Sequence, residues 1–175
     1  MPMIDVIVPE GALEPDAEAG LMKEMTDILI RAEGFDPETN QVAQSVSVVF
    51  LHRPVAVYVA GAPATKPRYR IIPSVPEGKY SDEAVGSLVW QLTEAFARAE
   101  GGKFEDVAPR VWIFPTEIPE GRWGARGVVR SVVEIQAMLG GEQERDLGKE
   151  LLAKRRRTKA IELIEAAADA ARRGG

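Results

Sequence analysis

The chain has no cysteine and a single histidine, His52. Without cysteine there are no disulfide bonds, no thiolate metal ligands and no cysteine nucleophile. With one histidine, a metal site that needs several histidines is excluded, and a serine–histidine–aspartate triad is disfavoured. We expect His52, at the end of a predicted strand, to be structural or exposed. Catalytic chemistry would therefore have to come from other groups.

Long apolar runs are also missing. No stretch approaches the roughly 20 apolar residues that a membrane-spanning helix needs, and the N-terminus shows no basic stretch followed by an apolar core. The formal net charge of −5 over 175 residues makes binding to nucleic acid or to an anionic membrane an unlikely main function. We expect a soluble, cytoplasmic protein that is large enough to bury a real core.

Two tetrapeptides each occur twice, and both pairs have the same spacing of 67 residues: VPEG at 8–11 and 75–78, and RAEG at 31–34 and 98–101. A repeat at a fixed period indicates that one structural unit occurs twice. We predict two units, over about 2–60 and 69–130, joined by a linker at 61–67.

The first unit reads as strand, helix and strand. Apolar residues alternate over 2–8, which predicts a strand with a buried face, and they follow helical spacing from Pro15 to Ala32. Pro15 suits a first helical position. We predict a second strand over 42–51 and a shorter third one over 55–61.

The second unit repeats this order. We predict a strand over 69–75, a helix that begins after the N-cap Ser81, a strand over 108–118 and a short extended segment over 128–130. A strand, a crossover helix and a second strand imply parallel pairing. The predicted fold is α+β, with tandem β–α–β units that form one mostly parallel four-stranded sheet and two helices on one face.

The remaining segment has a different composition. Residues 142–173 are rich in Glu, Ala, Leu, Lys and Arg, which predicts a C-terminal helix. We therefore divide the chain into a domain over 1–140 and a helical extension over 141–175. The KRRR run at 154–157 could contact an acidic partner or nucleic acid, but we favour a solvated face or a subunit contact.

These features together resemble the tautomerase superfamily, the group of 4-oxalocrotonate tautomerase and macrophage migration inhibitory factor. The resemblance covers about residues 2–130. It lies in MP at the start, in EG directly after the first strand of a doubled β–α–β unit, and in FPTEIPEGRWGARG at 114–127. It implies the tautomerase fold in its fused two-unit form, a homotrimer, no cofactor and no metal.

The resemblance implies that Pro2 is catalytic. Once Met1 is removed, Pro2 would carry a free secondary amine, and chain-terminal amines have a reference pKa of about 7.7–8.0. An apolar pocket or nearby cations would lower this pKa, so that the neutral amine could act as a general base near pH 7. Family members use it to move a proton within a small enol or unsaturated keto acid. Relatives with a protonated proline hydrate or dehalogenate unsaturated acids.

A carboxylate substrate needs cations. In the family an arginine commonly follows the EG turn, whereas this chain has Ala12 in the first unit and Lys79 in the second. Another family arginine falls on Ser47 and on Trp112, and neither can replace it. Arg110, predicted on the same strand face as Trp112, is a possible substitute. We retain Lys79, Arg126, Arg110 and Trp112 as candidate substrate-binding residues.

Two further positions complete the predicted site. Trp123 matches an aromatic residue that walls the pocket of 4-oxalocrotonate tautomerase, with Tyr58 as its counterpart in the first unit. Glu117 lies where dehalogenase relatives have a glutamate that activates water, although the tautomerase also has one there. The histidine that cis-3-chloroacrylic acid dehalogenase carries on its first helix is missing, which argues against that activity.

The two units are not equivalent at the predicted catalytic position. Tyr69 stands where Pro2 would recur, so we expect one working site per chain. The predicted function is a cofactor-independent tautomerase. A hydratase, dehalogenase or decarboxylase-type lyase on the same scaffold stays open, as does a non-catalytic assembly protein that acts through its basic C-terminal helix.

Overall fold

The computed structural model describes residues 3–173, so Pro2 lies outside the described residues. The chain divides into two compact units. Unit 1 comprises Met1–Val75 and Tyr80–Glu117, and unit 2 comprises Pro76–Lys79 and Ile118–Gly175. The predicted domain boundary between residues 140 and 141 stays a prediction.

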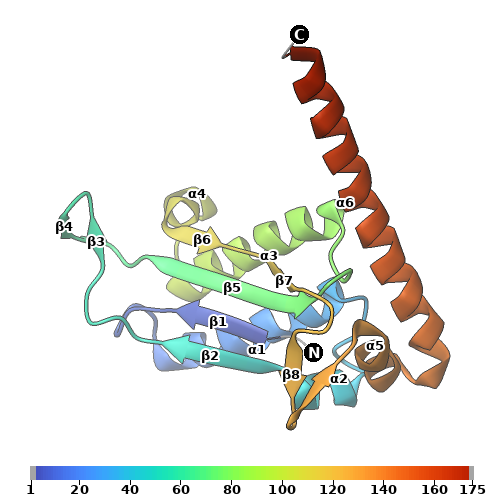
Figure 1. Ribbon diagram of the computed structural model, residues 1–175. Helices are drawn as coiled ribbons and strands as arrows, with labels where there is room; N and C mark the ends of the chain where they lie inside the picture. Colours follow the sequence, from blue (N-terminus) through green and yellow to red (C-terminus); the bar gives the residue numbers. More distant parts are fainter. Residues whose placement is uncertain (1–2, 174–175) are drawn as a thin grey trace. The chain divides into compact units, whose positions relative to one another are not determined.

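Unit 1 is built on a mixed sheet with strand order β2-β1-β5-β6, and β7 also pairs with β5 (Figure 1). Strands β1 and β2 are parallel, β5 and β6 are parallel, and β1 and β5 are antiparallel. The strands are β1 (Met3–Ile7), β2 (Val48–His52), β5 (Tyr69–Pro76), β6 (Val111–Ile113) and β7 (Thr116–Ile118). The predicted mostly parallel sheet is confirmed, and β7 extends it.

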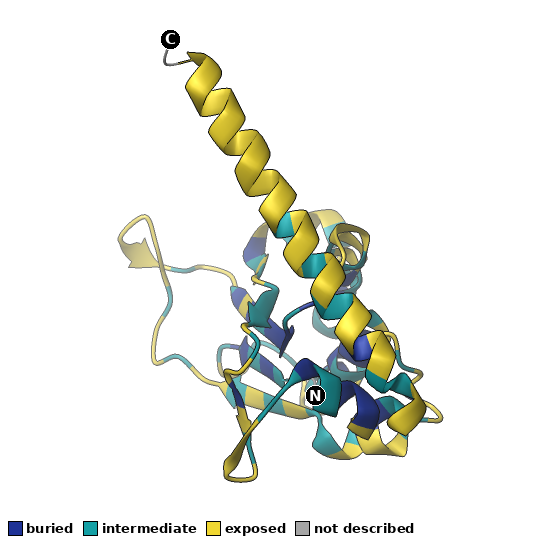
Figure 2. Cartoon of the chain, turned by 45° about the vertical axis from the view of Figure 1, so that its right-hand side comes forward, coloured by how far each residue is buried: buried dark blue, intermediate teal, exposed yellow. Residues whose placement is uncertain are grey.

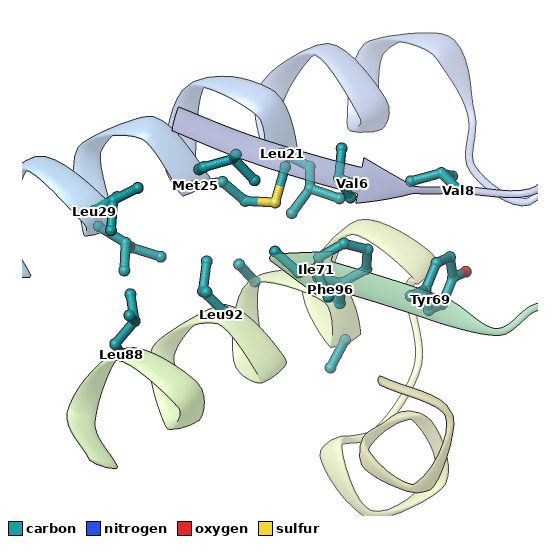
Figure 3. Close-up of a cluster of buried hydrophobic side chains, with 14 of the residues drawn as sticks. Val6, Val8, Leu21, Met25, Leu29, Tyr69, Ile71, Leu88, Leu92 and Phe96 are labelled. Atoms are coloured by element: carbon teal, nitrogen blue, oxygen red, sulfur yellow. The ribbon is translucent and has the colours of Figure 1, made fainter. Parts of the chain in front are cut away.

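Two long helices, α1 (Pro15–Ala32) and α3 (Asp82–Glu100), cover one face of this sheet, as predicted (Figure 1). Ser81 caps α3, since its side chain accepts a hydrogen bond from the backbone N–H of Ala84 at 3.1 Å. Apolar side chains of both helices meet those of β1 and β5 in a single core (Figure 3).

The buried positions of the two helices repeat with the spacing of the tetrapeptides. Five buried residues of α1 lie 67 positions before five buried residues of α3. The pairs are Leu21 and Leu88, Met25 and Leu92, Ile28 and Ala95, Leu29 and Phe96, and Ile30 and Ala97. The core is therefore a doubled core, which supports the predicted internal repeat.

The register of the central strands has the same symmetry. Asp5 of β1 pairs with Ile72 of β5, which is its own counterpart at the spacing of 67. A pseudo-two-fold axis that relates the halves consequently passes between these two residues. Farther along the chain the repeat spacing is shorter than 67 residues. Ile4 pairs with Val49, and its counterpart Ile71 pairs with Ile113, which follows Val49 by fewer than 67 residues.

Three predicted strands differ from the structure. Residues 41–46 form a helix, α2 (Gln41–Val46), because the Asn40 side chain accepts a hydrogen bond from the Ala43 N–H at 2.8 Å. The predicted third strand is only β3 (Tyr58–Val59), which forms a hairpin with β4 (Ala62–Pro63) inside the predicted linker.

The predicted strand over 108–118 is broken into β6 and β7 at Pro115, which lacks the N–H that a ladder needs. Before β6, the chain forms the short helices α4 (Phe104–Val107) and η1 (Ala108–Arg110).

Unit 2 contains a hairpin, two α-helices and a short 3-10 helix among its described residues. Strands β8 (Trp123–Ala125) and β9 (Val128–Arg130) pair antiparallel. They are followed by α5 (Val132–Gly140), η2 (Glu142–Glu144) and the long α6 (Arg145–Arg173). The predicted C-terminal helix is confirmed by α6, whereas α5 was not predicted.

Candidate functional site

The turn after β5 holds the cation that the sequence singles out. Lys79 is only 6% exposed, and its Nζ donates a hydrogen bond to Gln136 Oε1 at 2.6 Å. Gln136 is itself buried, and its Nε2 donates to Glu144 Oε2 at 3.1 Å. The bond from Nζ orients the Lys79 ammonium from the side of α5.

Neighbouring carboxylates fix the same turn. Glu77 Oε2 accepts a hydrogen bond from the Glu120 N–H at 3.0 Å, and Glu120 Oε2 accepts one from the Val132 N–H at 2.8 Å. The bond from the Glu120 N–H is the main cause that lowers the pKa of Glu77, with further contributions from Lys159 and Arg156. Glu77 thus ties the turn to the loop between β7 and β8, and Glu120 ties that loop to the start of α5.

Trp123 lies at the start of the β8–β9 hairpin and is 9% exposed, as expected for an apolar wall. Its hairpin turns through Arg126 and Gly127, which have φ angles of 53° and 77°. Two central residues with positive φ are typical of a tight type I′ turn. Arg126 is therefore at the exposed tip of the hairpin, and Arg122 is exposed as well.

Glu117 belongs to unit 1, where it faces a buried tyrosine. The Tyr80 N–H donates to Glu117 Oε1 at 3.5 Å, and the Tyr80 hydroxyl donates to the Pro73 carbonyl at 3.3 Å. Burial raises the pKa of Tyr80 well above its ordinary value, and the charges of Glu33 and Glu117 raise it further. Tyr80 is consequently a neutral hydrogen-bond donor at physiological pH.

Arg110 lies in a different network, around the residue that stands where Pro2 would recur. The Tyr69 hydroxyl donates to Glu100 at 2.7 Å, and Arg110 donates to both carboxylate oxygens of Glu100 and to the Pro67 carbonyl. Tyr69 is 2% exposed and its ring lies 4.8 Å from that of Phe96. This network gives Arg110 a structural role. The prediction that Arg110 shares a strand face with Trp112 is wrong, because Arg110 lies in η1 and is only 6% exposed. Its contact with substrate stays a prediction.

Trp112 points to the face of the sheet that α1 and α3 leave uncovered. The register places Val48, Phe50 and Trp112 on this open face, and they are 45%, 49% and 59% exposed. His52 lies on it too, half-exposed, with Nε2 2.8 Å from Asp5 Oδ1. The expectation that His52 is structural or exposed is confirmed.

The predicted site residues thus fall into two groups. Unit 2 holds Lys79, Trp123 and Arg126, whereas unit 1 holds Glu117, Trp112 and Arg110. The structure adds Gln136, which the sequence reading missed together with its helix. The sequence does signal the helix, because Ser131 and Glu134 form a capping box before an apolar run, but it does not signal the contact of Gln136 with Lys79.

Among residues 3–173, no group of three or more His, Asp or Glu side chains is arranged to hold a metal ion. None of the helices in this part of the chain combines the length and the apolar character that crossing a membrane would require.

The sequence matches no protein-family model and no curated protein. Its structure does resemble solved structures. One is a fused 4-OT (4-oxalocrotonate tautomerase) solved as an asymmetric trimer, with a TM-score of 0.57 and 20% identity over 73% of this chain and 94% of that chain. Macrophage migration inhibitory factor from Toxoplasma gondii has a TM-score of 0.56 and 16% identity over 73% and 99% of the two chains.

A member of the cis-3-chloroacrylic acid dehalogenase family is also similar, with a TM-score of 0.57 and 19% identity over 85% of this chain and 97% of that chain. At such identities the likeness concerns the fold. The doubled core, the register of the central strands and these neighbours agree, and the chain has the tautomerase-superfamily fold in its fused two-unit form.

Proposed function

We propose that this protein is a cofactor-independent tautomerase that moves a proton within a small enol or unsaturated keto acid. The observation that carries the proposal is the fused tautomerase fold in a chain whose second residue is proline. Removal of Met1 would leave Pro2 with a free secondary amine, and the neutral amine would be the general base.

The other proposed roles follow from residue chemistry. Lys79 would bind the substrate carboxylate through its ammonium, which Gln136 orients. Arg126 would supply a second cation from the tip of its hairpin, and Trp123 would provide an apolar wall that excludes water and favours the neutral amine. Glu117, Arg110 and Trp112 remain candidate contacts.

One working site per chain is part of the proposal. The nitrogen of Tyr69 is a backbone amide, so the second half has no amine at the equivalent position. The Tyr69 side chain is moreover buried and bonded to Glu100. The structure thereby supports an asymmetric pair of halves, of which only the first could provide a catalytic amine.

We further propose that the protein is a homotrimer in the cytoplasm. Fused 4-OT neighbours are solved as trimers. In this chain the open face of the sheet presents Val48, Phe50, Trp112 and Phe114, each at least 45% exposed. Large exposed apolar side chains on one face of a sheet are typical of subunit interfaces.

Hydratase or dehalogenase chemistry, with a protonated Pro2 as acid and Glu117 activating water, is the second candidate. The similar fold of a cis-3-chloroacrylic acid dehalogenase family member favours it. Against it, α1 carries no histidine. The pKa of the Pro2 amine, measured by titration, separates the two, since a low value suits a base and a high value suits an acid.

The first test is ketonisation of phenylenolpyruvate and 2-hydroxymuconate after mass spectrometry has shown that Met1 is gone. We expect Pro2→Ala to lower kcat/KM by about 10²–10⁴-fold, the usual contribution of a general base. Tyr69→Phe, at the equivalent position of the second half, is the control and should leave turnover nearly unchanged. A processed wild type that turns over neither enol would refute the proposal.

A covalent probe gives an independent readout. One structural neighbour was solved after inactivation by 2-oxo-3-pentynoate. If Pro2 is a nucleophilic neutral amine, this compound should add to the N-terminal peptide of the wild type, and the adduct should be absent after blocking the amine by acetylation. Labelling that is confined to lysine side chains would count against Pro2.

A further inference from the structure

The long helix α6 packs against the rest of unit 2 along its first half. Gly148 lies against Val133 and Gln136 of α5, since a Cβ built on it would come within 3.0 Å of both. Farther along, Arg156 and Lys159 lie 3.8 Å and 3.6 Å from Glu77. These contacts hold α6 to α5 and to the turn after β5.

Every residue of α6 from Ala160 to Arg173 is exposed, as the yellow end of the helix in Figure 2 shows. Its side chains are largely apolar. Ile161, Leu163 and Ile164 are 49%, 72% and 68% exposed, and six of the other residues up to Ala171 are alanine. Helical spacing places Ile161, Ile164, Ala168 and Ala171 in one line, which we call the α6 seam.

Most helical stability in proteins comes from packing of an apolar face, and an apolar seam in water is unfavourable. The seam therefore fits a partner helix. Its spacing of three and four residues matches the positions that meet in a two-stranded coiled coil, and its alanines allow two backbones to approach closely.

Charge indicates which helix that partner is. Residues 154–159 contain five basic side chains, and Glu162, Glu165 and Asp169 follow them. Arg157 lies one helical turn before Ile161, on the line of the seam. A second copy of α6 in parallel would bring the two basic segments together. An antiparallel copy would instead bring each basic segment beside the acidic residues of the other helix.

We propose that α6 pairs with α6 of a second copy of this chain, antiparallel and centred between Ile161 and Ile164. In this register Ile161 of one helix lies opposite Ile164 of the other. Arg157 lies opposite the small Ala168 and within reach of Glu165 and Asp169 of the second copy. The inference concerns assembly and does not depend on the proposed activity.

Pairing through α6 would double whatever assembly the rest of the chain forms. Two trimers joined by three such antiparallel pairs would close as a hexamer with two-fold and three-fold axes. Three weak contacts that form together also bind more tightly than one, because the second and third are intramolecular.

The first test is the mass of the full-length protein in sedimentation equilibrium. We expect the double variant Ile161→Glu, Ile164→Glu to have half the mass of the wild type. Leu163→Glu is the matched control, because Leu163 is equally apolar and exposed but lies off the seam. Equal masses for the wild type and the double variant, or the same loss in the control, would overturn the proposal.

The second test uses the absence of native cysteine, since a single introduced cysteine can cross-link only to another copy. In the proposed register, residue 164 lies about 5 Å along the helix axis from its own copy, and residue 171 lies about 25 Å away, at 1.5 Å per residue. Under mild oxidation Ile164→Cys should form a covalent dimer and Ala171→Cys should not.

Equal cross-linking of both cysteine variants would indicate parallel helices and refute the assigned orientation. If neither variant cross-links and the mass is already that of the double variant, α6 does not pair with itself. The exposed seam would then serve a different protein, and the inference would fail while the proposed enzymatic function would be unaffected.

Discussion

The two β–α–β halves of the repeat bury equivalent positions, but the connections between their first strand and their helix have different surroundings. In the first half the strand–helix connection passes through Gly11, and a Cβ at this residue would meet nothing within 4 Å. In the second half the equivalent Gly78 belongs to unit 2, and a Cβ there would lie 3.1 Å from the backbone of Leu151 and Leu152. Identical tetrapeptides therefore have different surroundings.

The ion pairs of the halves differ in the same sense. In the first half Arg53 contacts Glu18, and the two side chains are 39% and 19% exposed. In the second half Arg110 contacts Glu100 with side chains that are only 7% and 20% exposed. The two halves share their buried apolar positions, because each half has to form the same core. Their polar contacts differ, because each half has different neighbours.

The largest expected effect comes from the shared core. Phe96→Ala should lower the free energy of unfolding by about 3–5 kcal/mol, and Leu29→Ala, at the equivalent position of the first half, by about 2–5 kcal/mol. Phe96 should cost more, because its larger ring also contacts Tyr69. Urea denaturation measures both. A much smaller loss in one half would show that the two cores are not equivalent.

The next effect separates the ion pairs. Arg110→Met leaves the Glu100 carboxylate with the Tyr69 hydroxyl as a donor but without its cation, and it removes the donor to the Pro67 carbonyl. It should cost about 2–4 kcal/mol, somewhat less than breaking a fully buried pair. Arg53→Met removes an ion pair whose arginine is more exposed, together with a hydrogen bond to the Val8 carbonyl, and should shift the urea midpoint less. Similar shifts for the two variants would contradict the contrast drawn between the halves.

The two glycines provide a smaller effect. Gly11 and Gly78 have φ angles of 70° and 93°, so alanine at Gly11 should cost about 1 kcal/mol through backbone strain alone. Alanine at Gly78 should cost about 2–3 kcal/mol, because its Cβ would also crowd the α6 backbone. Thermal unfolding of both variants provides the comparison. Equal losses of stability would show that α6 can move away from the added Cβ without destabilising the protein.

The smallest effect concerns pH. Burial tends to raise the pKa of Glu100, but hydrogen bonds from Arg110 and Tyr69 outweigh it and hold the pKa below its ordinary value. The unfolded chain then binds the proton more readily, so the stabilisation is present above pH 4.5 and is lost as pH falls through the folded pKa. Wild type should lose more stability between pH 6 and 3 than Glu100→Gln, as urea midpoints would show.

The sequence predicted the parts of the fold that follow from period and spacing. Helices α1 and α3 and the two parallel strand pairs could be predicted because apolar residues recur at the intervals of helices and strands. Pro15 and the N-cap Ser81 marked where the two helices begin. Residues 42–46 were misread, since Val42, Ala43 and Val46 suit a strand as well as a helix and only the Asn40 cap decides.

The candidate site was readable to a lesser extent. Lys79 and Trp123 could be selected from their places in the repeat and the late loop. Gln136 could not, because it meets Lys79 across 57 residues of sequence, and no local pattern encodes such a contact. The network around Arg110 was hidden for the same reason.

The pairing of Asp5 with Ile72 has a consequence for a chain that contains its own duplicate. Had the halves been two identical subunits joined across an isologous interface, position 5 would face itself, and an aspartate there would meet a second aspartate. Like charges directly opposite one another destabilise paired strands. Covalent fusion removes this constraint. In this chain β1 carries Asp5, which is hydrogen-bonded to His52, and β5 carries the aliphatic Ile72 opposite it.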